Sequence, residues 1–145
     1  MLGRCSSSSL FHRFHGPGDG IAYTVAQLQR RDDMVLLAWE HDRCLGMGVL
    51  AGPSNLDLHL GVLVEDQRQR QGIGTALVTN LINAARRRGV PSIHADVMGE
   101  DHQLVVILGR LGKTTAHVES GTFSVNIDLL QPPTNPPTKE RTCIR

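Results

Sequence analysis

Hydrophobic positions along the chain fall into short runs separated by glycine, proline and polar residues. Such apolar or alternating runs are typical of β-strands. On this pattern, strands are expected at residues 34–39, 44–50, 56–64, 115–118 and 122–129. The first two runs form one predicted antiparallel hairpin and the last two form another. Residues 51–55 are predicted as a turn that leads to the strand at residues 56–64. Met34 and Trp39, on the first strand, are expected in the core.

The start of the chain has a helical pattern instead. Leu10, Phe11 and Phe14 recur at helical spacing, which predicts one apolar face of a short amphipathic helix. The serines at residues 6–9 are of the type that caps helix N-termini. The glycines and proline of residues 16–20 then end this helix.

The remaining segments define the domain organisation. Residues 21–31 have no clear period, and a second helix is one interpretation of them. From residue 131 the composition changes to proline and polar residues, which can enter neither a sheet nor a helix. We therefore expect a single domain over residues 1–130, followed by a disordered tail over residues 131–145.

Composition agrees with this organisation. The chain has 145 residues, 40% hydrophobic and 20% charged, so it can bury a core without disulfides or metals. The net charge of +1 gives no indication of nucleic-acid or membrane binding. Cys5, Cys44 and Cys143 form no C-x-x-C pair, so we expect no metal site and a cytoplasmic location. No apolar run reaches the ~18 residues of a membrane span, and residues 1–10 lack the hydrophobic segment of a secretory signal.

The candidate chemistry gathers in residues 69–75, Gln-Arg-Gln-Gly-Ile-Gly-Thr. They lie between the strand that ends at Val64 and a long helical pattern at residues 76–88. Two glycines spaced by one residue let the backbone approach a ligand closely. The unpaired N–H groups at a helix start attract anions. This strand–turn–helix arrangement predicts a phosphate-binding cradle.

Two common nucleotide motifs do not fit the cradle. A Rossmann fingerprint requires a third glycine where this chain has Leu77. A Walker loop requires lysine and then serine or threonine after its last glycine, and residues 75–76 do not supply this pair. Residues 112–114 read Gly-Lys-Thr, but Ile107 stands where the first glycine of a Walker loop belongs.

Residues 69–74 match in full the pattern Q/R-x-x-G-x-G/A, and here the chain resembles the GNAT acetyltransferase superfamily. In that family this turn holds the pyrophosphate of acetyl-CoA. The family's cofactor strand, the end of its next helix, the following strand and the end of its last helix resemble residues 62–64, 84–90, 93–97 and 108–112. The resemblance covers residues 6–130 and implies an α/β (α+β) GNAT fold, a mixed central sheet with flanking helices.

Within the superfamily, residues 6–14 resemble the first helix of bacterial Pat-type protein lysine acetyltransferases, which reads roughly S-x-x-S-L-x-x-R-F. Family members usually have a strand ahead of this helix, and only residues 1–5 precede it here. Two interpretations stay open. Either the sheet lacks its usual first strand and leaves an unpaired edge that invites a second copy of the chain, or the sequence begins late.

The resemblance implies acetyl-CoA as the co-substrate, held mostly by backbone groups. The expected contacts are Val62, Leu63, Val64, Gln69, Arg70, Gln71, Gly72, Ile73, Gly74, Thr75 and Asp101. A backbone N–H near Val62 would stabilise the charge that develops on the thioester oxygen. Asp101 stands where the family commonly has an asparagine, and a carboxylate cannot donate the hydrogen bond that an amide can.

The catalytic positions depart further from the family pattern. Pat-type enzymes carry a glutamate on the cofactor strand, and aligning the turn places His59 there. Asp57 precedes it by two residues and so shares its face of the strand. His59 can act as a base near neutral pH, and a half-buried structural histidine is the alternative. Asp57 is the base itself, the partner that orients His59, or an exposed carboxylate. Leu108 stands where many members have a tyrosine acid.

We therefore expect an acetyl-CoA-dependent N-acetyltransferase that modifies a primary amine, of a protein lysine or of a small molecule. The competing hypothesis is a catalytically degenerate acyl-CoA-binding or regulatory module, which the missing glutamate, tyrosine, asparagine and first strand favour. The expected partners are acetyl-CoA and the amine acceptor, without nucleic acid, membrane or metal. Whether the chain forms a homodimer stays open.

Overall fold

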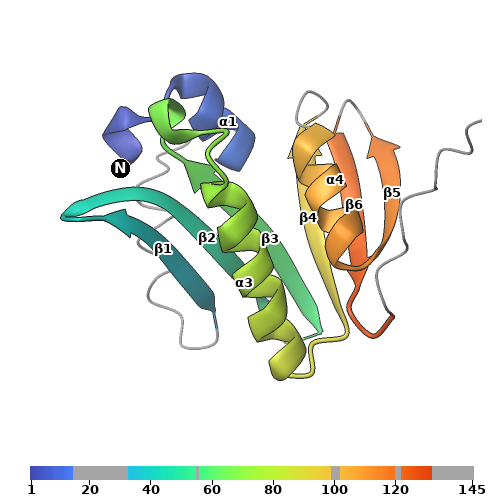
Figure 1. Ribbon diagram of the computed structural model, residues 1–145. Helices are drawn as coiled ribbons and strands as arrows, with labels where there is room; N and C mark the ends of the chain where they lie inside the picture. The colour runs from blue at the N-terminus through green and yellow to red at the C-terminus, as the bar shows by residue number, and fades with distance from the viewer. Residues whose placement is uncertain (15–32, 55, 99–101, 120–121, 132–145) are drawn as a thin grey trace, which may run out of the picture.

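The computed structural model describes residues 1–14, 33–54, 56–98, 102–119 and 122–131. These residues form a six-stranded sheet with helices packed against it (Figure 1). The strands are β1 (Met34–Glu40), β2 (Arg43–Ser54), β3 (Asp57–Val64), β4 (Ser92–Met98), β5 (Lys113–Glu119) and β6 (Thr122–Asp128). The helices are α1 (Ser7–Phe14), α3 (Ile73–Arg87) and α4 (His102–Leu111), and η1 (Leu2–Arg4) and η2 (Asp66–Arg68) are short 3-10 helices.

The strands lie in the order β1-β2-β3-β4-β6-β5. Neighbouring strands are antiparallel except β3 and β4, which are parallel and are connected through α3. Helices α3 and α4 cover one face of the sheet (Figure 1). Helix α1 lies on the other face, where the Arg13 side chain packs over Gly61 of β3. The predicted mixed sheet with flanking helices is confirmed, as are both predicted hairpins and the first helix.

The main core lies between the sheet and the helices α3 and α4. Successive side chains of a strand alternate between faces, so alternate residues of β3, β4 and β6 point into this core. Its fully buried members include Leu50, Leu81, Ile82, Ala85, Ile93, Leu108, Val125 and Ile127. Gly48 lets α3 approach β2 closely, since a Cβ at this position would lie 2.8 Å from Cδ1 of Leu81.

Two predicted boundaries are wrong. The turn expected at residues 51–55 does not begin at Ala51, because β2 continues to Ser54 and pairs Ala51 with His59. Gly52 permits this extension, since a Cβ there would come within 1.8 Å of the carbonyl oxygen of Asp57. Helix α3 begins at Ile73, so the second glycine of the turn already belongs to its first turn.

The edge of the sheet also differs from one expectation. Met34 is buried as predicted. Trp39 was also expected in the core, but it is 59% exposed. Trp39 lies near the end of β1, which is one of the two edge strands of the sheet formed by the described residues. Residues 2–4 form η1 rather than a strand, so in the described part of the chain no strand precedes α1. Residues 21–31 and the tail from residue 132 lie outside the described residues.

Candidate active site

The parallel strands β3 and β4 are paired over a short stretch only. Their register joins Leu58 to Ile93 and His59 to His94. Beyond these pairs the strands diverge, and Figure 1 shows the gap between them widening toward the end of β3. Residues 60–64 pair with β2 on one side, while no described strand pairs with their other side. Because backbone N–H and C=O groups need partners, this open edge suits a ligand that can bond to it as a strand does.

The glycine turn lies at the wide end of this divergence. Gly72 is the N-cap of α3 and has φ of +84°, a left-handed conformation that favours glycine. No side chain caps the helix, and its first turn contains no acidic residue. The N–H groups of Ile73, Gly74 and Thr75 have no acceptor within the helix and lie at its positive end. This arrangement suits a phosphate group.

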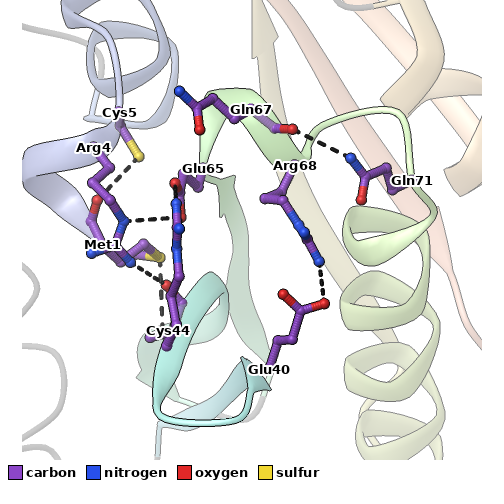
Figure 2. Close-up of polar contacts among 10 residues, drawn as sticks. Met1, Arg4, Cys5, Glu40, Cys44, Glu65, Gln67, Arg68 and Gln71 are labelled. Carbon is purple, nitrogen blue, oxygen red and sulfur yellow. Dashed lines mark hydrogen bonds and ion pairs between the residues drawn. The ribbon is translucent and has the colours of Figure 1, made fainter.

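The polar side chains of the turn brace the loop. Nε2 of Gln69 donates to the carbonyl oxygen of Val64 and to Oγ of Ser9, both at 3.2 Å. Nε2 of Gln71 donates to the carbonyl oxygen of Gln67 at 3.3 Å (Figure 2). The two glutamine amides therefore hold the shape of the turn, and the backbone is what the turn offers to a ligand.

A buried carboxylate follows the end of β3. Glu65 is 1% exposed. It accepts hydrogen bonds from Nε of Arg43 at 3.2 Å and from Nη2 of the same side chain. Figure 2 shows its ion pair with Arg4, whose Nε lies 3.0 Å from Oε2 of Glu65. These interactions, above all the hydrogen bonds from Arg43, lower the pKa of Glu65. Arg4 also donates to the carbonyl oxygen of Cys44 at 2.8 Å, so η1 and β2 are both tied to the end of β3.

The next residue, Asp66, holds the start of α1. Its Oδ2 accepts the backbone N–H of Ser6 at 3.0 Å, and Oγ of Ser6 accepts the N–H of Ser9 at 3.1 Å. Hydrogen bonds from the Ser6 and Ser9 hydroxyls lower the pKa of Asp66. The serines thus cap the helix as expected. Asp66 ties the start of α1 to the loop that also carries the glycine turn.

Asp57 and His59 lie on the face of β3 that is turned away from α3. Oδ1 of Asp57 is 3.5 Å from Nε2 of His59, and the two side chains are 50% and 55% exposed. His59 is therefore about half-buried, with the rest of its side chain accessible to solvent. On β4, the ring of His94 lies beside His59, with ring centroids 5.6 Å apart and planes tilted by 33°.

Sequence reasoning missed His94. The available signal was the alternation in residues 93–97, where the buried positions Ile93, Ala95 and Val97 leave His94 and Asp96 on the opposite face. Leu108, at the position of the family's tyrosine, is 0% exposed inside the core. Asp101 lies outside the described residues.

The described residues contain neither a cluster of metal ligands nor a membrane-spanning helix. No three or more histidine, cysteine, aspartate or glutamate side chains are placed there to hold a metal ion. None of the described helices is both long enough and apolar enough to cross a membrane.

Residues 8–112 match the acetyltransferase (GNAT) family, and the chain therefore belongs to this family. The matched residues include the divergent strands and the glycine turn. No curated protein sequence matches it.

Several solved structures are similar to the chain. The GNAT domain of S. lividans PAT has 20% identity and a TM-score of 0.72, with 87% of this chain and 80% of that domain covered. The protein yncA from Salmonella typhimurium, solved with its cofactor acetyl-CoA, has 17% identity and a TM-score of 0.67, with coverage of 84% and 83%. The PaiA N-acetyltransferase from Thermoplasma acidophilum, solved with coenzyme A, has 14% identity and a TM-score of 0.64, with coverage of 88% and 82%. These similarities establish the fold.

The buried Glu65 gives the protein a specific acid sensitivity. Because its folded pKa is lowered, its ion pairs stabilise the fold above the usual titration range of a glutamate and are lost as the pH falls through the folded pKa. We expect Glu65→Gln to lower the free energy of unfolding at neutral pH and to flatten its decline as the pH falls from neutral through the usual titration range of a glutamate and below it. Urea unfolding across this range measures both effects.

The matched control is Glu40→Gln, which removes the ion pair of Glu40 with Arg68 at a site where the carboxylate side chain is 47% exposed, against 1% for Glu65. An exposed pair contributes only about 0–1 kcal/mol. If Glu65→Gln were no less stable than Glu40→Gln at neutral pH, the buried pair would not hold the end of β3 as described.

Proposed function

We propose that this protein is an acetyl-CoA-dependent N-acetyltransferase that transfers an acetyl group to a primary amine. The observation that carries the proposal is a continuous track of backbone donors and acceptors. It runs along the open edge of residues 60–64 and ends at the uncapped N-terminus of α3. Family membership and the acetyl-CoA and coenzyme A of two structural neighbours support the same ligand.

The track fits acetyl-CoA in its chemistry. A pyrophosphate is the kind of anion that the N–H groups after Gly72 attract, and the exposed Arg70 adds positive charge beside them. The pantetheine arm carries amides, which can bond to an open strand edge as a neighbouring strand would. Bound in this track, acetyl-CoA would supply the acetyl group as an activated thioester.

The chain's own groups divide the remaining work. A backbone N–H near Val62, on the open edge, would stabilise negative charge on the thioester oxygen. His59 would remove a proton from the acceptor ammonium. Asp57, 3.5 Å from Nε2 of His59, would accept that N–H and leave Nδ1 as the basic nitrogen, as carboxylates do for other catalytic histidines.

The acceptor is a primary amine of a protein lysine or of a small molecule. The pattern of residues 6–14 and the similarity to the S. lividans PAT domain support a protein lysine.

The β1 edge leaves room for a homodimer in the described part of the sheet. A cytoplasmic location is consistent with the cysteine content.

One observation favours a second function, an acyl-CoA-binding regulatory module. Leu108 fills the position of the family's tyrosine and is fully buried, so no phenol is available there as an acid. Thiol release from acetyl-CoA, measured with a panel of small amines and lysine peptides, separates the two functions. We expect release with at least one acceptor. Binding of acetyl-CoA without release for any of them would identify the regulatory module instead.

The phosphate-binding role of the turn is tested by Gly72→Asp. This substitution places a side chain at a φ of +84° and a negative charge where the pyrophosphate would bind. We expect the Kd for acetyl-CoA to rise at least about tenfold, which corresponds to ~1.4 kcal/mol, as measured by calorimetry. Gly89→Asp is the matched control, because Gly89 also has a positive φ and open surroundings but lies at the other end of α3. Equal binding by both variants would contradict the assignment.

The role of His59 is tested by the pH dependence of turnover. Only a neutral imidazole accepts a proton, so the rate should rise with pH as His59 loses its own. We expect His59→Gln to flatten this limb and to lower turnover by roughly 10²-fold or more, with the affinity for acetyl-CoA nearly unchanged. A variant with the full turnover and pH profile of the native protein would leave Asp57 or water as the base.

A further inference from the structure

A row of polar side chains crosses the sheet where β3 and β4 begin to diverge. Asp57 and His59 belong to β3. His59 is in register with His94 of β4, and His94 is in register with Asn126 of β6. These four side chains, which we call the vertex row, lie on the face of the sheet turned away from α3. They therefore mark the closed end of the track whose open end is the glycine turn.

The two imidazoles of the vertex row are close enough to influence each other. Their centroids are 5.6 Å apart, and Asp57 lies 3.5 Å from Nε2 of His59 at one end of the row. The His59 side chain is 55% exposed, so water can reach the pair. A water molecule between the rings could carry a proton from one imidazole to the other.

Asn126 occupies the other end of the row. Its Oδ1 is buried and accepts no hydrogen bond from any described residue. A buried acceptor without a donor is costly, and the register places His94 beside it. A ring N–H of His94 is a donor of the kind that this oxygen lacks. A hydrogen bond between them would fix the tautomer of His94 and leave its second nitrogen available for proton transfer.

We propose that His59 and His94 form a two-imidazole proton relay, in which Asp57 orients His59 and Asn126 positions His94. The proposal rests on the acetyltransferase function given above. Amide formation removes two protons from the acceptor ammonium, and one of them must end on the departing thiol while the other goes to solvent.

The relay gives each proton a path. His59 takes the first proton from the ammonium and passes it to His94, which delivers it to the thiolate as the C–S bond breaks. His59 takes the second proton from the nitrogen of the new C–N bond and releases it to solvent. The protein returns to its starting state, and no other reactant is needed. Because Leu108 supplies no acid, His94 fills a role that the sequence left without a candidate.

Charged groups from three elements face the pair. Asp57 lies on β3, and Asp96 lies on β4, where its Oδ1 accepts a hydrogen bond from Oγ of Ser124 at 3.0 Å. Arg13 of α1 lies over Gly61, next to His59 on the same face of β3. At a centroid distance of 5.6 Å, positive charges on both rings would repel each other.

The kinetic test is His94→Gln. We expect kcat to fall by roughly 10²-fold and the KM for acetyl-CoA to stay the same. The plot of kcat against pH should change in both its acid and its alkaline limb. Asn126→Ala should give a smaller loss in the same direction. His117→Gln is the matched control, because His117 lies on the same face two strands away and is exposed. A native kcat and pH profile for His94→Gln, alongside an impaired His59→Gln, would show that His59 acts alone.

The second test needs no turnover. The imidazole C2–H signals of His59 and His94 can be assigned by NMR from the single variants and followed against pH. At 5.6 Å, removing one imidazolium should raise the titration midpoint of the other by about 0.5 to 2 pH units, so His94→Gln should shift His59 and His117→Gln should not.

These measurements separate the two proposals. If the native protein had no turnover but the His59 and His94 titrations were coupled, the acetyltransferase function would be contradicted. The close pairing of the two imidazoles would still hold. Native turnover with independent titrations would contradict the relay alone.

Discussion

The divergence of β3 and β4 is the constraint on which the rest of the site depends. A sheet normally satisfies its backbone groups strand by strand, and here the parallel ladder ends after Leu58–Ile93 and His59–His94. The open edge that results comprises residues 60–64, whose backbone groups can bond to a ligand. The same divergence fixes the two ends of the site, because the glycine turn follows β3 at the wide end and the vertex row lies at the narrow end.

Such an open edge needs support from the surrounding structure. Glu65 supplies it directly after β3, since its buried carboxylate joins Arg4 and Arg43 from two other parts of the chain. Asp66 then holds the first turn of α1 through Ser6. The helix that covers one face of the site and the turn that would bind phosphate are therefore attached to one loop. Loss of the Glu65 ion pairs would loosen both together.

Much of the fold could be predicted from the sequence because its signals are local. Apolar runs and their separating polar stretches identified the strands, and two glycines before a helical pattern identified the turn at residues 69–75. The end of β2 was misplaced because glycine and proline usually mark turns, whereas Gly52 here allows a close approach of the backbone to Asp57. Trp39 was misplaced because burial depends on the neighbours of an edge strand, which the sequence of that strand does not contain.

The site was less predictable because it depends on register between distant segments. Periodicity placed Asp57 and His59 on one face, but only the pairing of β3 with β4 brings His94 beside them. Gln69 was expected among the residues of a turn that holds the cofactor mostly by backbone groups, and in the structure its side chain donates to Val64 and Ser9. A motif therefore located the turn correctly without revealing which of its groups face the ligand.

The central claim is that acetyl-CoA binds along the open edge of β3 and at the start of α3. Amide hydrogen exchange with and without acetyl-CoA tests this most directly. We predict slower exchange in residues 60–64 and 72–75 when acetyl-CoA is present, with no change in β5 and β6. Protection confined to the groove between β1 and α3, which is lined by Leu36, Ala38, Ile73 and Asn80, or no protection at all, would contradict the account.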